Sequence, residues 1–279
     1  MRKQNIIKRI RSGSKVLIAA MGFALMAFTP IENSQSASSF EYRALGNQAF
    51  GYNEELSFRV HYGFINAAVI DMKVGSSPVL VNNRNTYYIK AEGKTISTFD
   101  WMFKVRDKFE TYIDQDALAP QKYQKAVIED NYKDTDVVIF KHEDKNLYSS
   151  KAKGKLTMPE YTQDIVSALY YARNLDFANA TKGKEFPLSI YLDEEIYNLK
   201  FKYDGKETIK TDVGKVKCIR LVPKLVVDRV FKNEDDMTIW VSDDANKIPI
   251  RVKAKIAVGS LKVDLTSYKN LRNPFTALQ

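Results

Sequence analysis

The sequence predicts a mainly β protein: a curved antiparallel sheet or incomplete β-barrel with one central α-helix packed on it. Three observations carry this prediction. Many short segments alternate apolar and polar residues with a period of two, turn-forming clusters separate them, and one mid-chain segment has helical spacing instead. The prediction concerns residues 40–279, because residues 1–39 have a different character.

Residues 1–39 are typical of a secretory signal peptide. Basic residues precede an unbroken small and apolar run from Val16 to Phe28, and a polar small-residue stretch follows from Asn33 to Ser39. A run of about 13 apolar residues is too short to cross the roughly 30 Å hydrocarbon core as a stable anchor. We therefore expect a periplasmic or otherwise exported protein with no stable membrane anchor after signal cleavage. An uncleaved N-terminal anchor is the alternative.

Much of the excess positive charge belongs to this first segment. The chain carries 43 Lys and Arg against 34 Asp and Glu, a net charge of +9. Residues 1–39 hold six of the basic and one of the acidic residues, which leaves 37 against 33 and a net charge of +4. This near balance argues against the basic surface on which nucleic-acid binding depends, so we expect no nucleic-acid partner.

The first half of residues 40–279 predicts a series of strands. In Glu55–Tyr62 apolar residues alternate with polar ones, Gly63 marks a turn, and the alternation resumes up to Gly75. Turn-forming clusters then separate further alternating or apolar segments. The further strands expected in this half are 86–92, 104–113, 122–129, 137–142 and 147–150.

The second half has the same pattern. Residues 197–203 alternate, and Asp204-Gly205 after them is a strong hairpin signal. The other strands expected here are 215–223, 236–242, 250–258 and 261–265. Roughly a dozen short strands imply an antiparallel sheet that curls into a barrel or half-barrel, or splits into two layers. A membrane-spanning barrel also has alternating strands, but the mid-chain helix disfavours it. No linker is evident, so we expect residues 40–279 to form one domain.

A helix is expected within residues 159–176. Ile165, Ala168, Leu169 and Ala172 follow the spacing of one helix face, and Pro159 suits a first helical turn. A single amphipathic helix must bury its apolar stripe, and the open face of a curved sheet is the natural place.

No catalytic or metal-binding pattern stands out. The two histidines, His61 and His142, have no second histidine or cysteine at metal-ligand spacing, and no nucleophile elbow is present. We therefore expect no catalytic residue, no metal and no cofactor. Paired carboxylates for glycoside hydrolysis stay open, because their separation is spatial and not sequential.

Aromatic residues, at 12% of the chain, are the remaining indication of function. Inside a barrel they can line an apolar ligand cavity, although filling the core is the alternative for each of them. The candidate ligand-binding residues are Trp101, Tyr170, Tyr171, Arg173 and Trp240. The three on the expected helix are placed to control access to the interior.

The stretch Gln-Asp-Ile-Val-Ser-Ala-Leu-Tyr-Tyr-Ala-Arg at 163–173 resembles an exported bacterial family of unknown function, number 3108 in the domain-of-unknown-function series. Residues 55–74 are similar to its opening hairpin, and 240–250 followed by Gly259 to its closing hairpins. The resemblance covers most of residues 50–270. It implies an exported β-rich protein, without an established activity or catalytic residues. A shape similar to lipoprotein-carrier half-barrels is an analogy at the level of fold.

Two function hypotheses follow. The first is a non-enzymatic cell-envelope protein that binds a lipid, or another apolar or amphiphilic small molecule, in its half-barrel. The alternative is a cell-envelope hydrolase that acts on glycans through paired carboxylates.

Overall fold

The computed structural model describes residues 40–152, 154–224, 236–256 and 259–279, so the expected signal peptide lies outside the described residues. The described strands form one 15-stranded sheet. The strands are β1 (Glu55–Tyr62), β2 (Ile65–Val74), β3 (Val79–Val81), β4 (Arg84–Thr95), β5 (Arg106–Asp114), β6 (Pro120–Glu129), β7 (Tyr132–Lys141), β8 (Asn146–Ser149), β9 (Lys155–Thr157), β10 (Glu185–Leu192), β11 (Glu195–Thr211), β12 (Gly214–Pro223), β13 (Met237–Ser242), β14 (Pro249–Lys255) and β15 (Ser260–Lys269).

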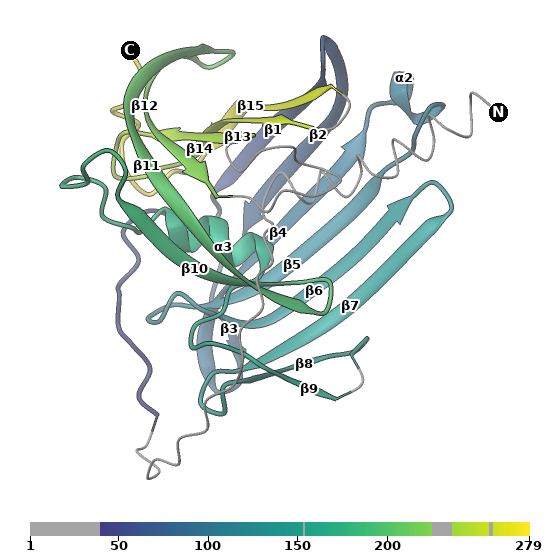
Figure 1. Cartoon of the computed structure of the whole chain (residues 1–279), viewed down its shortest axis with the longest axis vertical. Helices are drawn as coiled ribbons and strands as arrows, with labels where there is room; N and C mark the ends of the chain where they lie inside the picture. Colours follow the sequence, from purple (N-terminus) through teal and green to yellow (C-terminus); the bar gives the residue numbers. More distant parts are fainter. Residues whose placement is uncertain (1–39, 153, 225–235, 257–258) are drawn as a thin grey trace.

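The sheet is antiparallel and open. Its strand order is β10-β11-β12-β13-β14-β15-β1-β2-β4-β5-β6-β7-β8-β9, with β3 paired to β4 beside this path. No pairing between described strands joins β9 to β10, although the sheet curls strongly (Figure 1). The expected mainly β architecture with one large, incompletely closed antiparallel sheet is confirmed.

The central strand β1 begins and ends where the sequence pattern predicts. Leu56, Phe58 and Val60 are buried, whereas the residues between them are half-buried. The strand pairs with β2 on one side and with β15, about 200 residues later, on the other. Because a slip of one residue would turn the apolar face outward, this alternation holds the register on both sides.

The prediction of a hairpin turn at Asp204-Gly205 is wrong. Strand β11 continues through these residues, and the chain turns only after Thr211, before β12 begins at Gly214. The β11–β12 register shifts between Tyr203 and Lys206, and Gly205 has a φ of 99°. The glycine therefore permits a β-bulge, which uses the same left-handed conformation as a tight hairpin turn.

The described residues contain two short helices, α2 (Ser97–Asp100) and α3 (Ile165–Ala172), so the expectation of a single helix is not confirmed. Helix α3 is also shorter than the range 159–176. Tyr161 has a φ of 58°, which interrupts a helix starting at Pro159. The helix begins instead after Asp164, whose Oδ1 accepts hydrogen bonds from the N–H groups of Val166 and Ser167 at 2.8 and 2.9 Å.

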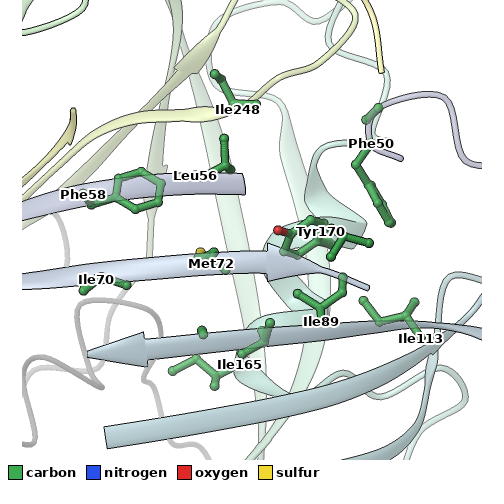
Figure 2. Close-up of a cluster of buried hydrophobic side chains, with 14 of the residues drawn as sticks. Phe50, Leu56, Phe58, Ile70, Met72, Ile89, Ile113, Ile165, Tyr170 and Ile248 are labelled. Atoms are coloured by element: carbon green, nitrogen blue, oxygen red, sulfur yellow. The ribbon is translucent and has the colours of Figure 1, made fainter. Parts of the chain in front are cut away.

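Helix α3 lies inside the curl of the sheet and contacts β5 and β10 (Figure 1). Ile165 and Tyr170 project from it into a buried cluster that includes Leu56, Met72 and Ile89 (Figure 2). In the apolar stripe predicted for this segment Ile165 and Ala168 are buried, whereas Leu169 and Ala172 are half-buried. Among the described helices, none has the length and apolar character needed to cross a membrane.

Candidate functional site

A cavity of about 70 Å³ lies between α3 and the half of the sheet that runs from β11 to β2. Most of its lining is aliphatic or aromatic. Its lining residues are Phe58, Ile70, Met72, Ile165, Ala168, Leu169, Ala172, Arg173, Phe201, Leu221, Ile239, Val241, Pro249, Arg251, Val252 and Val263. The small side chains of Ala168 and Ala172 leave room on the helix side. Among the described lining residues none is an aspartate or a glutamate, and the two arginines are the only polar ones.

The first of these arginines, Arg173, is buried at the C-terminal end of α3 and fully engaged. Its Nη1 and Nη2 donate to Oε1 and Oε2 of Glu54 at 2.6 and 2.8 Å. Its Nη2 also donates to the carbonyl of Ala49, and its Nε donates to the carbonyl of Asn246. Burial lowers the pKa of Arg173, but the Glu54 carboxylate outweighs this effect and keeps the pKa above its usual value. The guanidinium therefore ties α3 to two loops.

The second arginine, Arg251, is also paired. Its Nε donates to Oδ1 of Asp264 on the neighbouring strand β15, and its Nη2 donates to the carbonyl of Lys210 at 3.1 Å. Because both guanidinium groups already have partners, the cavity offers a ligand mainly apolar contacts. The part of a molecule that fits there is a hydrocarbon and not a charged group.

A second group of buried polar residues lies on the other half of the sheet. Asp107 on β5 is buried beside Glu129 on β6, and burial together with the Glu129 charge raises the pKa of Asp107 to about 7. Asp164 at the start of α3 is fully buried, and burial raises its pKa to about 6. These carboxylates lie outside the lining of the cavity, so the described lining residues include no carboxylate pair of the kind that glycan hydrolysis requires.

The structure brings two of the five candidate ligand-binding residues together. The guanidinium carbon of Arg173 lies 5.0 Å from the ring centroid of Tyr170. Tyr170 is fully buried and packs edge-on against Phe50, with ring centroids 4.8 Å apart. Arg173 lines the cavity, whereas Tyr170 belongs to the core cluster.

The side chains of the other three candidates have different surroundings from this pair. Tyr171 is half-buried, with the guanidinium of Arg43 4.9 Å from its ring centroid. Trp101 follows α2 and is 77% exposed. Trp240 on β13 faces away from the cavity, because its neighbours Ile239 and Val241 line it. The five residues do not form one site, and their role in binding stays a prediction.

Most of the cavity lining lies outside the predicted site, because that prediction rested on the aromatic residues. Phe58, Val252 and Val263 nevertheless lie on apolar strand faces that the alternation identifies. The alternation with a period of two therefore indicated these lining residues. The pairing of Arg173 with Glu54 has no such signal, since 119 residues separate the two in the chain.

A family model described as "Protein of unknown function (DUF3108)" matches residues 57–266. The chain belongs to this family. The match spans β1 to β15 and α3, so the resemblance seen in the helix and hairpin segments is confirmed. A search of curated proteins finds no match for this DUF3108 protein.

Three solved structures match most of the chain. The DUF3108 protein is similar to a β-barrel-like protein of the family of unknown function DUF1849 from Brucella abortus, with 9% identity, a TM-score of 0.51 and coverage of 79% of this chain and 99% of that one. A candidate lipoprotein from Parabacteroides distasonis matches with 10% identity, a TM-score of 0.33 and coverage of 82% and 100%. A candidate exported protein with a YmcC-like fold from Bacteroides fragilis matches with 11% identity, a TM-score of 0.34 and the same two coverages. Only the first structure has a TM-score above 0.5, and at 9% identity it is informative about the β-barrel-like fold alone.

Proposed function

We propose that this DUF3108 protein is an exported, non-enzymatic, single-domain protein that binds a lipid or another amphiphilic molecule, whose apolar chain lies in the cavity beside α3. The observation that carries the proposal is the apolar lining of that cavity, whose two arginines are already paired with Glu54 and Asp264. An alkyl chain needs no hydrogen-bond partner and gains free energy from burial against such a surface.

The size of the cavity limits what part of the ligand it receives. A volume of about 70 Å³ is several times the roughly 10–15 Å³ that one water molecule requires. This suffices for a segment of one hydrocarbon chain and not for a whole lipid. We infer that the polar part of the ligand lies outside the cavity, where water and surface side chains solvate it.

Native mass spectrometry of the gently purified protein tests the proposal. We expect a bound mass in the range of an amphiphile, which denaturation releases. The substitution Ala172→Phe places a ring in the cavity, so we expect this variant to lose the bound mass. Ala178→Phe is the matched control, because it makes the same change at an exposed position after the helix.

The outcomes separate ligand binding from a packed core. A wild-type protein that is always empty, and that gains no mass when incubated with fatty acids or phospholipids, contradicts the proposal. So does an Ala172→Phe variant that folds and retains the bound mass.

Export rests on the composition of residues 1–39. We expect the protein recovered from the periplasmic fraction to have lost this segment, and mass spectrometry of its N-terminus measures the loss. Recovery of the intact chain with the cell membranes contradicts cleavage and favours an uncleaved anchor.

A further inference from the structure

Exposed apolar side chains gather at one end of the strands, in or beside the connections β1–β2, β4–β5 and β6–β7. Phe64, in the turn between β1 and β2, is fully exposed, and Ile65 beside it is 55% exposed. Trp101 follows α2 in the connection between β4 and β5, and Tyr132 begins β7 with 51% of its surface exposed. We call these four residues the apolar tips. Isolated apolar residues are normal on a surface, but four exposed apolar side chains on neighbouring connections are not.

Backbone contacts place the three connections side by side. The N–H of Ile96, just before α2, donates to the carbonyl of Ala67 in β2 at 3.1 Å. The N–H of Asp130, between β6 and β7, donates to the carbonyl of Lys104 at 2.8 Å. Figure 1 shows the β1–β2 turn, α2 and the β6–β7 turn along the same side of the molecule. The apolar tips therefore point out from one edge of the curled sheet.

Lysines accompany the tips. Lys94, Lys104 and Lys133 are exposed at the same end, and the described residues form no ion pair with any of them. Two carboxylates lie close by: Asp100 forms an ion pair with Arg106 at 2.6 Å, and Asp130 accepts a hydrogen bond from the backbone N–H of Lys104. This edge thus combines projecting aromatic rings with three exposed lysines whose ammonium groups form no ion pair with a described residue. The same combination stabilises proteins at the interface of a bilayer, where aromatic rings sit among headgroups and lysines contact anionic lipids.

We propose that this edge docks on the surface of an anionic lipid bilayer, with Phe64 and Trp101 inserted among the headgroups. The alternative occupant, a second protein or a second copy of this chain, would bury the rings in a dry interface and would not require anionic lipid. The inference concerns a surface separate from the cavity and stands without the proposed function.

Co-sedimentation with lipid vesicles tests the docking. The protein is used as the cell processes it, and vesicles of phosphatidylcholine are compared with vesicles that also contain phosphatidylglycerol. We expect binding to the anionic vesicles, and a marked loss of it on raising the salt from roughly 0.1 M to about 1 M. We expect Phe64→Ser with Trp101→Ser to lower the vesicle affinity about tenfold or more, since each ring loses its burial.

Matched control variants distinguish binding through this edge from nonspecific adsorption to vesicles. Val79→Ser with Leu80→Ser removes two exposed apolar side chains on β3, which precedes the start of β4 at the other end of the sheet. We expect this control to bind vesicles as the wild type does. Lys94→Gln, Lys104→Gln and Lys133→Gln together should weaken binding to anionic vesicles only. Because all variants share one N-terminus, differences among them report on the substituted positions.

The docking proposal and the cavity proposal fail separately. Ala172→Phe should leave vesicle binding unchanged, and the Phe64 and Trp101 substitutions should leave the mass bound in the cavity unchanged. Absence of wild-type vesicle binding overturns the docking proposal. The proposal is also overturned if folded Phe64→Ser/Trp101→Ser protein binds vesicles as well as the wild type does, or if the β3 control loses as much binding as that variant. A concentration-dependent dimer that forms without anionic lipid, and that those two substitutions abolish, overturns it as well.

Discussion

Arg173 illustrates why a buried charge persists in this protein. The guanidinium is almost completely inaccessible, yet Glu54 and the carbonyls of Ala49 and Asn246 accept its hydrogen bonds. A buried ion pair is not by itself strong evidence for stability, because removing two charges from water is costly. The hydrogen bonds of Arg173 instead fix the position of α3. They join the end of the helix to the loop before β1 and to the loop between β13 and β14. One wall of the cavity depends on that position.

Asp107 gives the stability of the protein a specific pH dependence. Well below pH 4 this carboxyl is protonated in the folded and unfolded chains alike. As the pH rises to about 7, the unfolded chain ionises while the folded one keeps its proton, because burial and the nearby Glu129 raise the pKa of Asp107 to about 7. The contribution of Asp107 therefore lowers the free energy of unfolding over this range and stays constant above it.

We expect Asp107→Asn to remove this penalty. The amide oxygen can still accept the hydrogen bond from the N–H of Ile128, which is 3.2 Å from Oδ1. The variant should be more stable than the wild type at pH 8 by roughly 1–3 kcal/mol, and similar at pH 4. Urea unfolding at both pH values measures the difference. Asp116→Asn is the control, since that carboxylate is exposed. A gain that is equal at the two pH values would contradict the argument.

At the scale of elements, the period of two predicted strands well and connections less well. Strand β1 and the two strands that flank the Asp114–Pro120 connection lie close to the ranges expected from alternation. Strands β3, β9 and β10 were overlooked. The first two are only three residues long, and alternation over so short a segment carries little signal. The Asp204-Gly205 bulge shows the other limit, because pairing decides whether a left-handed glycine turns the chain or bends a strand.

The start of α3 depends on Asp164, which the sequence analysis did not single out. Its Oδ1 caps the helix, and its Oδ2 accepts a hydrogen bond from the hydroxyl of Thr111 on β5 at 2.5 Å. The residue therefore fixes both where α3 begins and how it meets the sheet. Pro159 is favourable in a first helical turn, but its side chain has no polar atom. It therefore cannot cap a helix or bond to the sheet as Asp164 does.

We expect Asp164→Ala to lower the free energy of unfolding by about 2 kcal/mol, because it removes the cap and leaves the buried Thr111 hydroxyl without its acceptor. Asp164→Asn keeps an oxygen for the N–H groups of Val166 and Ser167, so it should lose clearly less. Urea unfolding at pH 7 compares the two variants. Equal destabilisation by both substitutions would show that the charge, and not the cap, holds the helix.

On the scale of the whole molecule, side-chain contacts join the two lateral edges of the open sheet, where its strand order begins and ends. Lys125 on β6 forms ion pairs with Asp134 on β7 and with Asp193 in the turn between β10 and β11. The hydroxyl of Tyr191 on β10 donates to Oδ2 of Asp136 on β7 at 2.8 Å. Strand β10, at one end of the sheet, is thereby held against strands near the other end. Between the described strands, these side-chain contacts and not a closed ladder of backbone hydrogen bonds join the two edges of the sheet around α3.

This arrangement predicts a local effect for Tyr191→Phe. The substitution keeps the ring and removes the hydrogen bond to Asp136, which should cost about 1–3 kcal/mol because the acceptor is a buried carboxylate. Hydrogen exchange should accelerate most in β10 and in the adjoining part of β11, whereas β1 and β2 in the middle of the sheet should change little. Tyr148→Phe, at an exposed position on β8, controls for loss of a hydroxyl. Uniform acceleration over all strands would mean that β10 opens only when the whole sheet unfolds, and that the Tyr191 contact is not what holds the curl.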